Sequence, residues 1–281
     1  MLRVAVPNKG SLSAAAIAML SEAGYRQRRD DRDLVTVDPD NEAEFFYLRP
    51  RDIATYVGSG QLDVGITGRD LLLDDDPGAD EVLALGFGRS TFRYAAVPGT
   101  LTTLENLAGR RIASSYAGLV RRDLEQRGVS AEVIRLDGAV ETAIRLGVAD
   151  VIADVVSTGT TLRQAGLETV GSPILESEAV LIRQANAAHD TQVDQLIRRL
   201  TGVVIARQYA MIDYDIRVEQ VEAACELTPG IESPTVSPLH DKGWVAVRAM
   251  IERREAHQIM DALFDLGARG ILVTDILACR V

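Results

Sequence analysis

The sequence predicts an α/β protein with two lobes, followed by a smaller C-terminal domain of mixed strands and helices. Along residues 1–206, short apolar runs alternate with stretches whose apolar residues recur at helical spacing. This alternation is typical of sheets built from parallel strands. Near residue 207 the predicted order changes to β-α-β-β-α-β, which is the ferredoxin-like arrangement.

Composition and charge limit the kinds of partner that this chain can have. The chain has 281 residues, a net charge of −11 and two cysteines, too few for a disulfide framework or a zinc site. No apolar run approaches the ~18 residues that a membrane span requires, and no apolar leader precedes the first predicted strand. The negative charge argues against a broad basic surface for nucleic acid. We therefore expect a soluble, cytoplasmic protein with no nucleic acid and no membrane partner.

Polar loops follow three predicted strands of the first lobe. Each loop carries a cation: Lys9 after Leu2–Val6, Arg49 after Phe45–Leu48, and Arg69, beside Asp70, after Asp63–Ile66. Ligands of open α/β sheets bind beyond the carboxyl ends of the strands, so these residues predict an anion site, although each could be an ordinary surface residue. Lys9 is one of only two lysines among 30 basic residues, which suggests that a compact ammonium is required there.

The order of the elements predicts two crossings between the lobes. Strands at Glu81–Gly86 and Phe92–Val97 lead into a second α/β unit, and a strand at Ser177–Arg183 returns to the first lobe. We predict lobe I at 1–90 with 178–206, lobe II at 91–177, and a third domain at 207–281. Two lobes joined in this way enclose a cleft, as in periplasmic binding proteins.

A hydroxyl-rich turn follows the buried strand Val151–Val156. The turn is Ser157-Thr158-Gly159-Thr160-Thr161, and helical spacing begins at Leu162. Free backbone N–H groups and a helix dipole at such a turn bind phosphate, while Asp154 is placed to accept hydrogen bonds from sugar hydroxyls. The single glycine and the absence of Gly-Lys-Ser/Thr exclude the dinucleotide fingerprint and the P-loop. The alternative is an ordinary helix cap with an incidental acid.

These motifs together resemble the long form of ATP phosphoribosyltransferase, the first enzyme of histidine biosynthesis, over essentially the whole chain. The most specific segments are Pro7–Leu12, Leu48–Ile53, Asp63–Asp70, Ala153–Leu162, Asp213–Asp215, Thr228–Gly230 and Glu232–Thr235. The resemblance implies that N1 of the adenine of ATP displaces pyrophosphate from 5-phosphoribosyl 1-diphosphate, with Mg²⁺ carried on the diphosphate and no metal site made of side chains. It also implies feedback inhibition by L-histidine and a homo-oligomer that changes from dimer to hexamer.

The resemblance assigns roles to particular residues. For phosphoribosyl diphosphate, Asp154 would bind the ribose hydroxyls and Ser157, Thr158, Gly159, Thr160 and Thr161 the 5′-phosphate. For ATP, Lys9 and Arg49 would contact its phosphates, unless they serve the diphosphate of the other substrate. Asp70 would contact the base or ribose, and Tyr116 a ring, unless Tyr116 only packs in the core or rim. The catalytic residues would be Asp154, Lys9 and Glu141; Glu141 faces the developing oxocarbenium or only a helix dipole. Histidine would bind Asp215, Thr235 and Gly270, unless Asp215 is a helix cap.

Three other functions fit parts of this pattern. A two-lobed solute receptor or regulator effector domain would share the cleft, but the expected export signal or DNA-binding helix pair is not seen. A phosphoribosyltransferase that uses another base would share the phosphate loop, and only the residues of the first lobe favour ATP. A non-catalytic regulatory homologue would share the fold; the intact Asp154–Leu162 segment and Lys9 argue against it.

Overall fold

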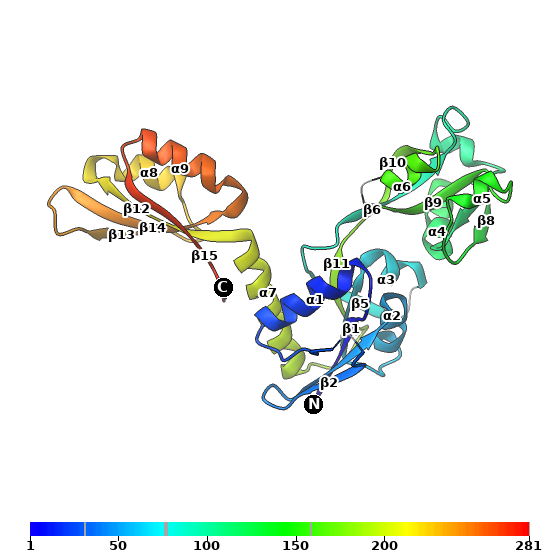
Figure 1. Ribbon diagram of the computed structural model, residues 1–281, viewed down its shortest axis with the longest axis horizontal. Helices are drawn as coiled ribbons and strands as arrows, with labels where there is room; N and C mark the ends of the chain where they lie inside the picture. Colours follow the sequence, from blue (N-terminus) through cyan, green and yellow to red (C-terminus); the bar gives the residue numbers. More distant parts are fainter. Residues whose placement is uncertain (31, 76–77, 158, 281) are drawn as a thin grey trace. The chain divides into compact units, whose positions relative to one another are not determined.

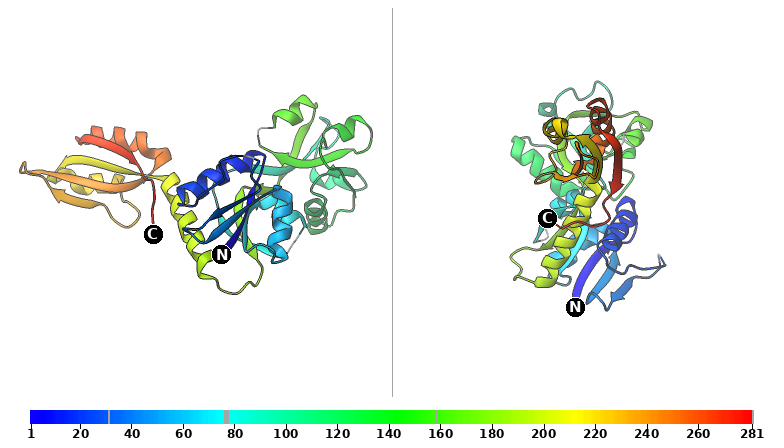
Figure 2. Two further views of the ribbon diagram at one scale, coloured as in Figure 1. Left: turned by 60° about the horizontal axis from the view of Figure 1, so that its bottom comes forward. Right: turned by 90° about the vertical axis from the view of Figure 1, so that its left-hand side faces the viewer.

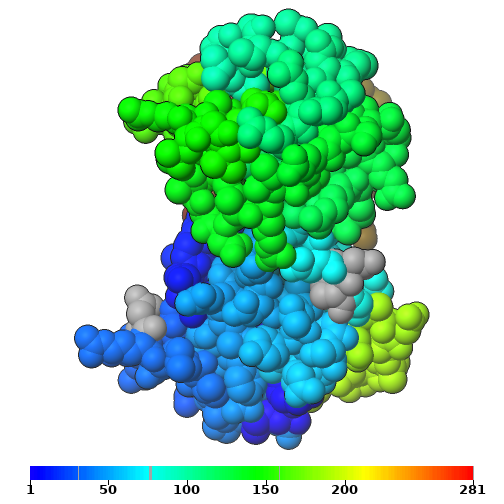
Figure 3. Space-filling view, turned by 90° about the vertical axis from the view of Figure 1, so that its right-hand side faces the viewer, coloured from blue at the N-terminus to red at the C-terminus, as the bar shows by residue number. Residues whose placement is uncertain are grey.

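The computed structural model describes residues 1–30, 32–75, 78–157 and 159–280 (Figure 1). The chain divides into two compact units, one of residues 1–21 with 25–194 and one of 22–24 with 195–281. The first unit contains a six-stranded sheet A and a five-stranded sheet B, and the second a four-stranded sheet C. Sheets A and B are the centres of lobes I and II. Figure 3 shows these lobes as two masses, blue to cyan and green, that meet at one junction.

Sheet A has the strand order β2-β3-β1-β4-β11-β5. Its elements are β1 (Leu2–Pro7), α1 (Ser11–Glu22), β2 (Val35–Asp38), β3 (Ala43–Leu48), α2 (Pro50–Gly58), β4 (Val64–Gly68), α3 (Arg69–Asp75), β5 (Ala79–Ala84) and β11 (Ala179–Gln184). β1 is parallel to both β3 and β4. Helices cover both faces of such a sheet, which is why β1 is almost continuously apolar. α2 begins with Pro50 at its first position, where a missing N–H costs nothing.

Sheet B has the order β10-β6-β9-β7-β8. Its elements are β6 (Ser90–Ala96), β7 (Arg111–Ser114), α4 (Ala117–Arg127), β8 (Glu132–Arg135), α5 (Thr142–Arg145), β9 (Val151–Val156), α6 (Thr160–Gln164) and β10 (Glu168–Ser177). α5, which follows Glu141, is a single turn. It ends early because Gly147 turns the chain with a φ of 69°.

The chain passes between the sheets twice, from β5 to β6 and from β10 to β11, as the sequence predicted. The two passages lie side by side. The Leu85 amide donates to the Ala179 carbonyl (2.9 Å), and the Ala179 amide donates to the Phe87 carbonyl (2.8 Å). β10 extends to Ser177 because it resumes pairing with β6 after a register shift between Val170 and Leu175. The end of β10 therefore reaches the passage back to lobe I.

Sheet C has the order β13-β14-β12-β15 and is antiparallel throughout. The second unit contains most of α7 (Thr191–Gln208), then β12 (Tyr209–Arg217), α8 (Val221–Leu227), β13 (Thr235–Pro238), β14 (Trp244–Glu252), α9 (Ala256–Asp265) and β15 (Arg269–Asp275). From β12 onward this is the predicted β-α-β-β-α-β order. α8 and α9 lie over one face of the sheet (Figures 1 and 2). Within the described ranges, no helix combines the length and apolarity needed to cross a membrane.

Candidate active site between the two lobes

The carboxyl ends of three adjacent parallel strands bring together the predicted residues of lobe I. In the order β3-β1-β4, Arg49 follows β3, Lys9 follows β1, and Asp70 lies in the first turn of α3 after β4. Lys9 and Arg49 are exposed, whereas Asp70 is buried. Arg69 differs from the prediction of a free cation. Its guanidinium bonds both carboxylate oxygens of Glu81, at 2.7 and 2.8 Å, so its charge is already neutralised.

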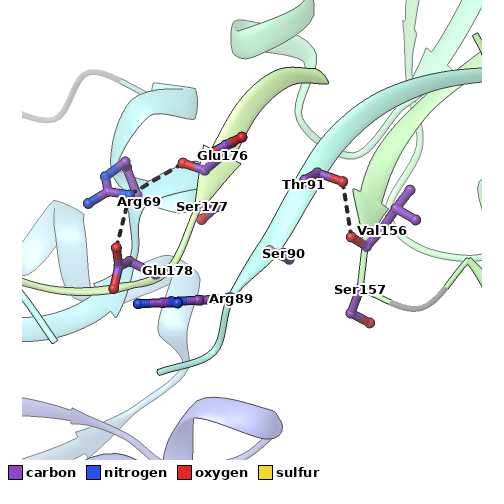
Figure 4. Close-up of a pocket in the computed structure, with 9 residues that line it drawn as sticks. All are labelled: Arg69, Arg89, Ser90, Thr91, Val156, Ser157, Glu176, Ser177 and Glu178. Atoms are coloured by element: carbon purple, nitrogen blue, oxygen red, sulfur yellow. Dashed lines mark hydrogen bonds and ion pairs between the residues drawn. The ribbon is translucent and has the colours of Figure 1, made fainter. Parts of the chain in front are cut away.

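Two cavities lie next to these strand ends. One of about 330 Å³ is lined by Lys9, Gly10, Ser11, Leu12, Pro50, Gly68, Asp70, Leu71, Gly88, Arg89, Ser90, Tyr116, Val155, Ser157 and Ser177. A second, of about 490 Å³, is lined by Arg69, Arg89, Ser90, Thr91, Val156, Ser157, Glu176, Ser177 and Glu178 (Figure 4). Both cavities take side chains from both lobes.

Sequence reasoning missed Arg89, Ser90 and Ser177, which line both cavities. All three lie on or beside the two passages between the sheets. Figure 4 shows Arg89 just before, and Ser90 at the start of, the strand that enters lobe II, and Ser177 on the strand that leaves it. The signal that could have found them was the predicted double crossing itself, because the connecting segments must run along the junction of the lobes.

Asp70 is held in a fixed position by its neighbours. Its carboxylate accepts a 2.7 Å hydrogen bond from the Ser177 hydroxyl, and both residues are buried. A Cβ at Gly68 would lie 2.3 Å from the Asp70 Oδ1 atom. Only glycine at position 68 therefore lets this carboxylate fold back over the end of β4.

Tyr116 both lines the cavity and packs against its neighbours. Its ring meets Phe92 edge-on at 5.3 Å, and the Arg51 guanidinium lies 4.9 Å from its centroid. Burial, and then the nearby Asp70 carboxylate, raise the pKa of the Tyr116 phenol well above its usual value. Tyr116 is therefore a rim residue placed beside Asp70, and its contact with a ring of ATP stays a prediction.

The predicted phosphate loop follows the end of β9. Ser157 is exposed and lines both cavities, while Thr158 lies outside the described residues. Gly159, with a φ of 70°, directly precedes α6, so a glycine is needed there. Thr160 and Thr161 are exposed in the first turn of α6.

Two further acids stand near this loop. Burial is the main cause that raises the pKa of Asp154, and the charges of Glu141 and Asp70 raise it further, against a 2.7 Å hydrogen bond from the Val155 amide. Glu141 precedes α5 but makes no side-chain cap to it. Its charge acts on Asp154, and both the role beside the ribose and the role as a helix partner stay predictions. Glu141 of lobe II and Asp70 of lobe I therefore create negative potential around Asp154.

The residues predicted for histidine lie on three strands of sheet C. Asp215 and Gly270 are neighbours, since a Cβ at Gly270 would lie 3.6 Å from the Asp215 Oδ2 atom. Thr235 pairs with Arg248, and Arg248 pairs with Asp213. Thr235 is therefore level across the strands with Asp213 and not with Asp215. The helix-cap alternative for Asp215 is wrong, because β12 continues to Arg217 and α8 starts only at Val221.

A cavity lined from both lobes, at the carboxyl ends of parallel strands, defines a two-lobed α/β protein with a ligand site between its lobes. The family model "ATP phosphoribosyltransferase" matches residues 49–202, and the model "HisG, C-terminal domain" matches residues 206–278. The chain belongs to the ATP phosphoribosyltransferase family, in the long form that carries the C-terminal domain. The predicted fold class and the predicted family are thereby confirmed.

Individual relatives agree with this membership. ATP phosphoribosyltransferase of Pseudarthrobacter chlorophenolicus is 65% identical, and that of Streptomyces coelicolor 63% identical, each over 100% of both chains. Among solved structures, the ATP phosphoribosyl transferase (HisG:HisZ) complex from Thermotoga maritima aligns with a TM-score of 0.63 at 26% identity. That alignment covers 73% of this chain and 98% of the other.

Proposed function

We propose that this chain transfers the phosphoribosyl group of 5-phosphoribosyl 1-diphosphate to N1 of ATP, releases pyrophosphate, and is inhibited by L-histidine through its C-terminal domain. Membership of the family supports the reaction. The observation that carries the assignment to residues is the cavity lined by Lys9 and Asp70 of lobe I and by Ser157 of lobe II. A donor and an acceptor substrate that bind different lobes would meet there.

The phosphoribosyl half would bind lobe II. Backbone N–H groups and hydroxyls of residues 157–161 would hold the 5′-phosphate, and Asp154 would accept hydrogen bonds from the ribose hydroxyls. As the bond to pyrophosphate lengthens, positive charge develops on the ribose. Asp154 and Glu141 would stabilise that charge in a site where burial strengthens electrostatic interactions.

The ATP half would bind mainly lobe I, with Tyr116 contributed by lobe II. Lys9 and Arg49 would contact phosphates, Asp70 the base or ribose, and Tyr116 a ring. Adenine N1 already carries a lone pair, so the reaction needs no strong general base at this position. The contribution of the protein would be to hold N1 in line with the departing pyrophosphate.

Mg²⁺ would enter on the diphosphate of the substrate. Within the described ranges, no group of three or more His, Cys, Asp or Glu residues is arranged to hold a metal ion. Asp154, Glu141 and Asp70 are close enough for their charges to interact, and a divalent cation on the diphosphate would offset the repulsion among these acids. Its chemical contribution would be to neutralise charge on the leaving pyrophosphate.

Two finer assignments complete the proposal. The domain division is lobe I at 1–90 with 178–206, lobe II at 91–177 and the histidine-sensing domain at 207–281.

The chain would form homo-oligomers, with dimers converting to hexamers when L-histidine binds. Analytical ultracentrifugation with and without L-histidine tests this conversion.

The reaction is tested directly with purified protein, ATP, phosphoribosyl diphosphate and Mg²⁺, with and without L-histidine. The readouts are pyrophosphate release and the ultraviolet change of N1-alkylated adenine. Product that L-histidine suppresses is the expected result. If product forms but L-histidine does not suppress it, only the sensor role of the C-terminal domain is refuted. If no product forms although the protein still binds phosphoribosyl diphosphate, the chain uses another acceptor base or is a non-catalytic homologue.

A further inference from the structure

A carboxylate of lobe I caps a helix of lobe II. Asp74 lies in the last turn of α3, with its side chain 1% exposed. Its Oδ1 atom accepts hydrogen bonds from the amides of Gly118 (2.8 Å) and Leu119 (3.1 Å), in the first turn of α4. The two helices belong to different sheets, so this contact joins the lobes.

The position of Asp74 suits α4 and not its own helix. An acid in the last turn of α3 is unfavourable for the dipole of α3, whereas an acid at the start of α4 is favourable. The first amides of a helix need partners from outside it, and the residue that precedes α4, Tyr116, makes no side-chain cap. Asp74 supplies the missing acceptor from 44 residues away.

Arg51 joins a third element to this contact. Its guanidinium donates to the Asp74 Oδ2 atom at 2.9 Å and to the Ser115 carbonyl at 3.0 Å. The same guanidinium stacks over Tyr116, 4.9 Å from the ring centroid. One side chain of α2 therefore contacts α3 and the two residues that precede α4.

Gly118 permits the close approach of the two helices. A Cβ at this position would lie 1.9 Å from the Asp74 carbonyl oxygen and 2.9 Å from its carbonyl carbon. Both atoms are backbone and cannot rotate away. No residue other than glycine fits between α3 and α4 at this spacing.

We propose that Asp74, Arg51 and Gly118, here called the α3–α4 latch, position Tyr116 beside Asp70 and so shape the ATP half of the site. The latch fixes the segment that immediately precedes α4, and Tyr116 is the residue of that segment that lines the cavity with Lys9 and Asp70. The phosphate loop lies between β9 and the first turn of α6, and its described residues, Ser157 and 159–161, take no part in the contacts given above. The inference rests on the proposed function, which assigns Tyr116 and Asp70 to ATP.

Steady-state kinetics of the full chain separate the two substrates. For Asp74→Ala and for Gly118→Ala, the KM for ATP is expected to rise on the order of tenfold. The KM for phosphoribosyl diphosphate should stay within about twofold, because its loop belongs to other elements. Asp74→Asn should be milder, since its amide oxygen can still accept from the two amides of α4.

Two aspartates provide controls. Asp75→Ala removes the neighbouring exposed acid of the same turn. Asp123→Ala removes a buried acid whose hydrogen bonds, to Tyr94 and Arg127, stay within lobe II. Neither should change the ratio of the two KM values, even if Asp123→Ala lowers stability. The proposal is overturned if Asp74→Ala leaves that ratio unchanged, or if Asp123→Ala shifts it equally.

Amide hydrogen exchange tests the latch without any substrate. In Asp74→Ala, the first turn of α4 should exchange about tenfold faster or more, and in Asp75→Ala at the rate of the unsubstituted chain. Unchanged exchange in Asp74→Ala would overturn the latch even in an active enzyme. If the unsubstituted chain shows no turnover, the proposed function is refuted. The hydrogen-exchange comparison would then still decide whether the latch exists.

Discussion

The hydroxyl of Ser177 donates a 2.7 Å hydrogen bond to the carboxylate of Asp70 and accepts one of 3.1 Å from the Asp70 amide. The two residues are 107 positions apart in the chain. Ser177 ends β10 of sheet B, and Asp70 opens α3 beyond sheet A. This reciprocal pair therefore ties the passage that leaves lobe II to the strand end that carries the acid of the candidate ATP site.

Ser177→Ala should weaken ATP binding. The substitution leaves the buried Asp70 carboxylate without a hydrogen bond that contributes about 1.5–3 kcal/mol when one partner is charged. We expect the KM for ATP to rise about tenfold and the melting temperature to fall. Kinetics and thermal denaturation measure both effects. Ser59→Ala, which removes an exposed hydroxyl bonded to its own helix, is the control and should change neither.

Asp154→Asn should lower turnover and raise stability together. Burial and neighbouring acids raise the pKa of Asp154 in the folded state. As the pH rises above the model-peptide value of 3.8, the folded state therefore loses stability that the neutral asparagine does not lose. Turnover should fall on the order of a hundredfold, because a charge opposite the developing cation is removed.

The measurements are the rate of pyrophosphate release and the melting temperature as a function of pH. The asparagine variant should melt higher than the unsubstituted chain at pH 7, with the difference shrinking as the pH falls toward 4. A variant that melts lower at pH 7 would contradict the assignment of an ionised, poorly solvated carboxylate.

Asp150→Asn should show the opposite pH dependence. Hydrogen bonds from the Arg111 side chain and amide lower the pKa of Asp150 to about 2. The pair is stabilising above the unfolded pKa of 3.8, and this stability is lost as the pH falls toward the folded value. Solvent screens the exposed pair, so at pH 7 the variant should melt only a few degrees lower. Equal melting temperatures at pH 7 would show that the ion pair contributes nothing.

Asp215→Ala should remove inhibition by L-histidine and leave turnover intact. The variant deletes the proposed partner for the cationic group of the ligand, and a charged hydrogen bond of this kind is worth at least about tenfold in affinity. Asp213→Ala on the same strand is the matched control, because Asp213 already bonds Arg248 at 2.6 Å. Inhibition curves with L-histidine measure the effect. An Asp215→Ala variant inhibited like the unsubstituted chain would refute the role of Asp215.

Local signals in the sequence predicted most of the elements and much of the candidate site. Pro50 marks the start of α2, and Gly159 marks the turn into α6, because each residue type satisfies a backbone requirement within a few residues of itself. Lys9 and Arg49 could be placed together because strand ends in a parallel sheet share one edge. The length of β10 and β12 could not be predicted, since pairing with a distant strand decides where a strand ends.

By itself, the sequence determined the two α/β lobes, the β-α-β-β-α-β domain and the loop that follows Asp154, since periodicity and turn residues act over short distances. Only the tertiary structure decided which side chains face one another across the lobes. Ser177 hydrogen-bonds Asp70, and Arg69 forms an ion pair with Glu81. Thr235 lies at the same register position of sheet C as Asp213, and Asp74 caps the start of α4. These contacts depend on strand register and helix packing, whose free energy comes from burying surfaces that are distant in the chain.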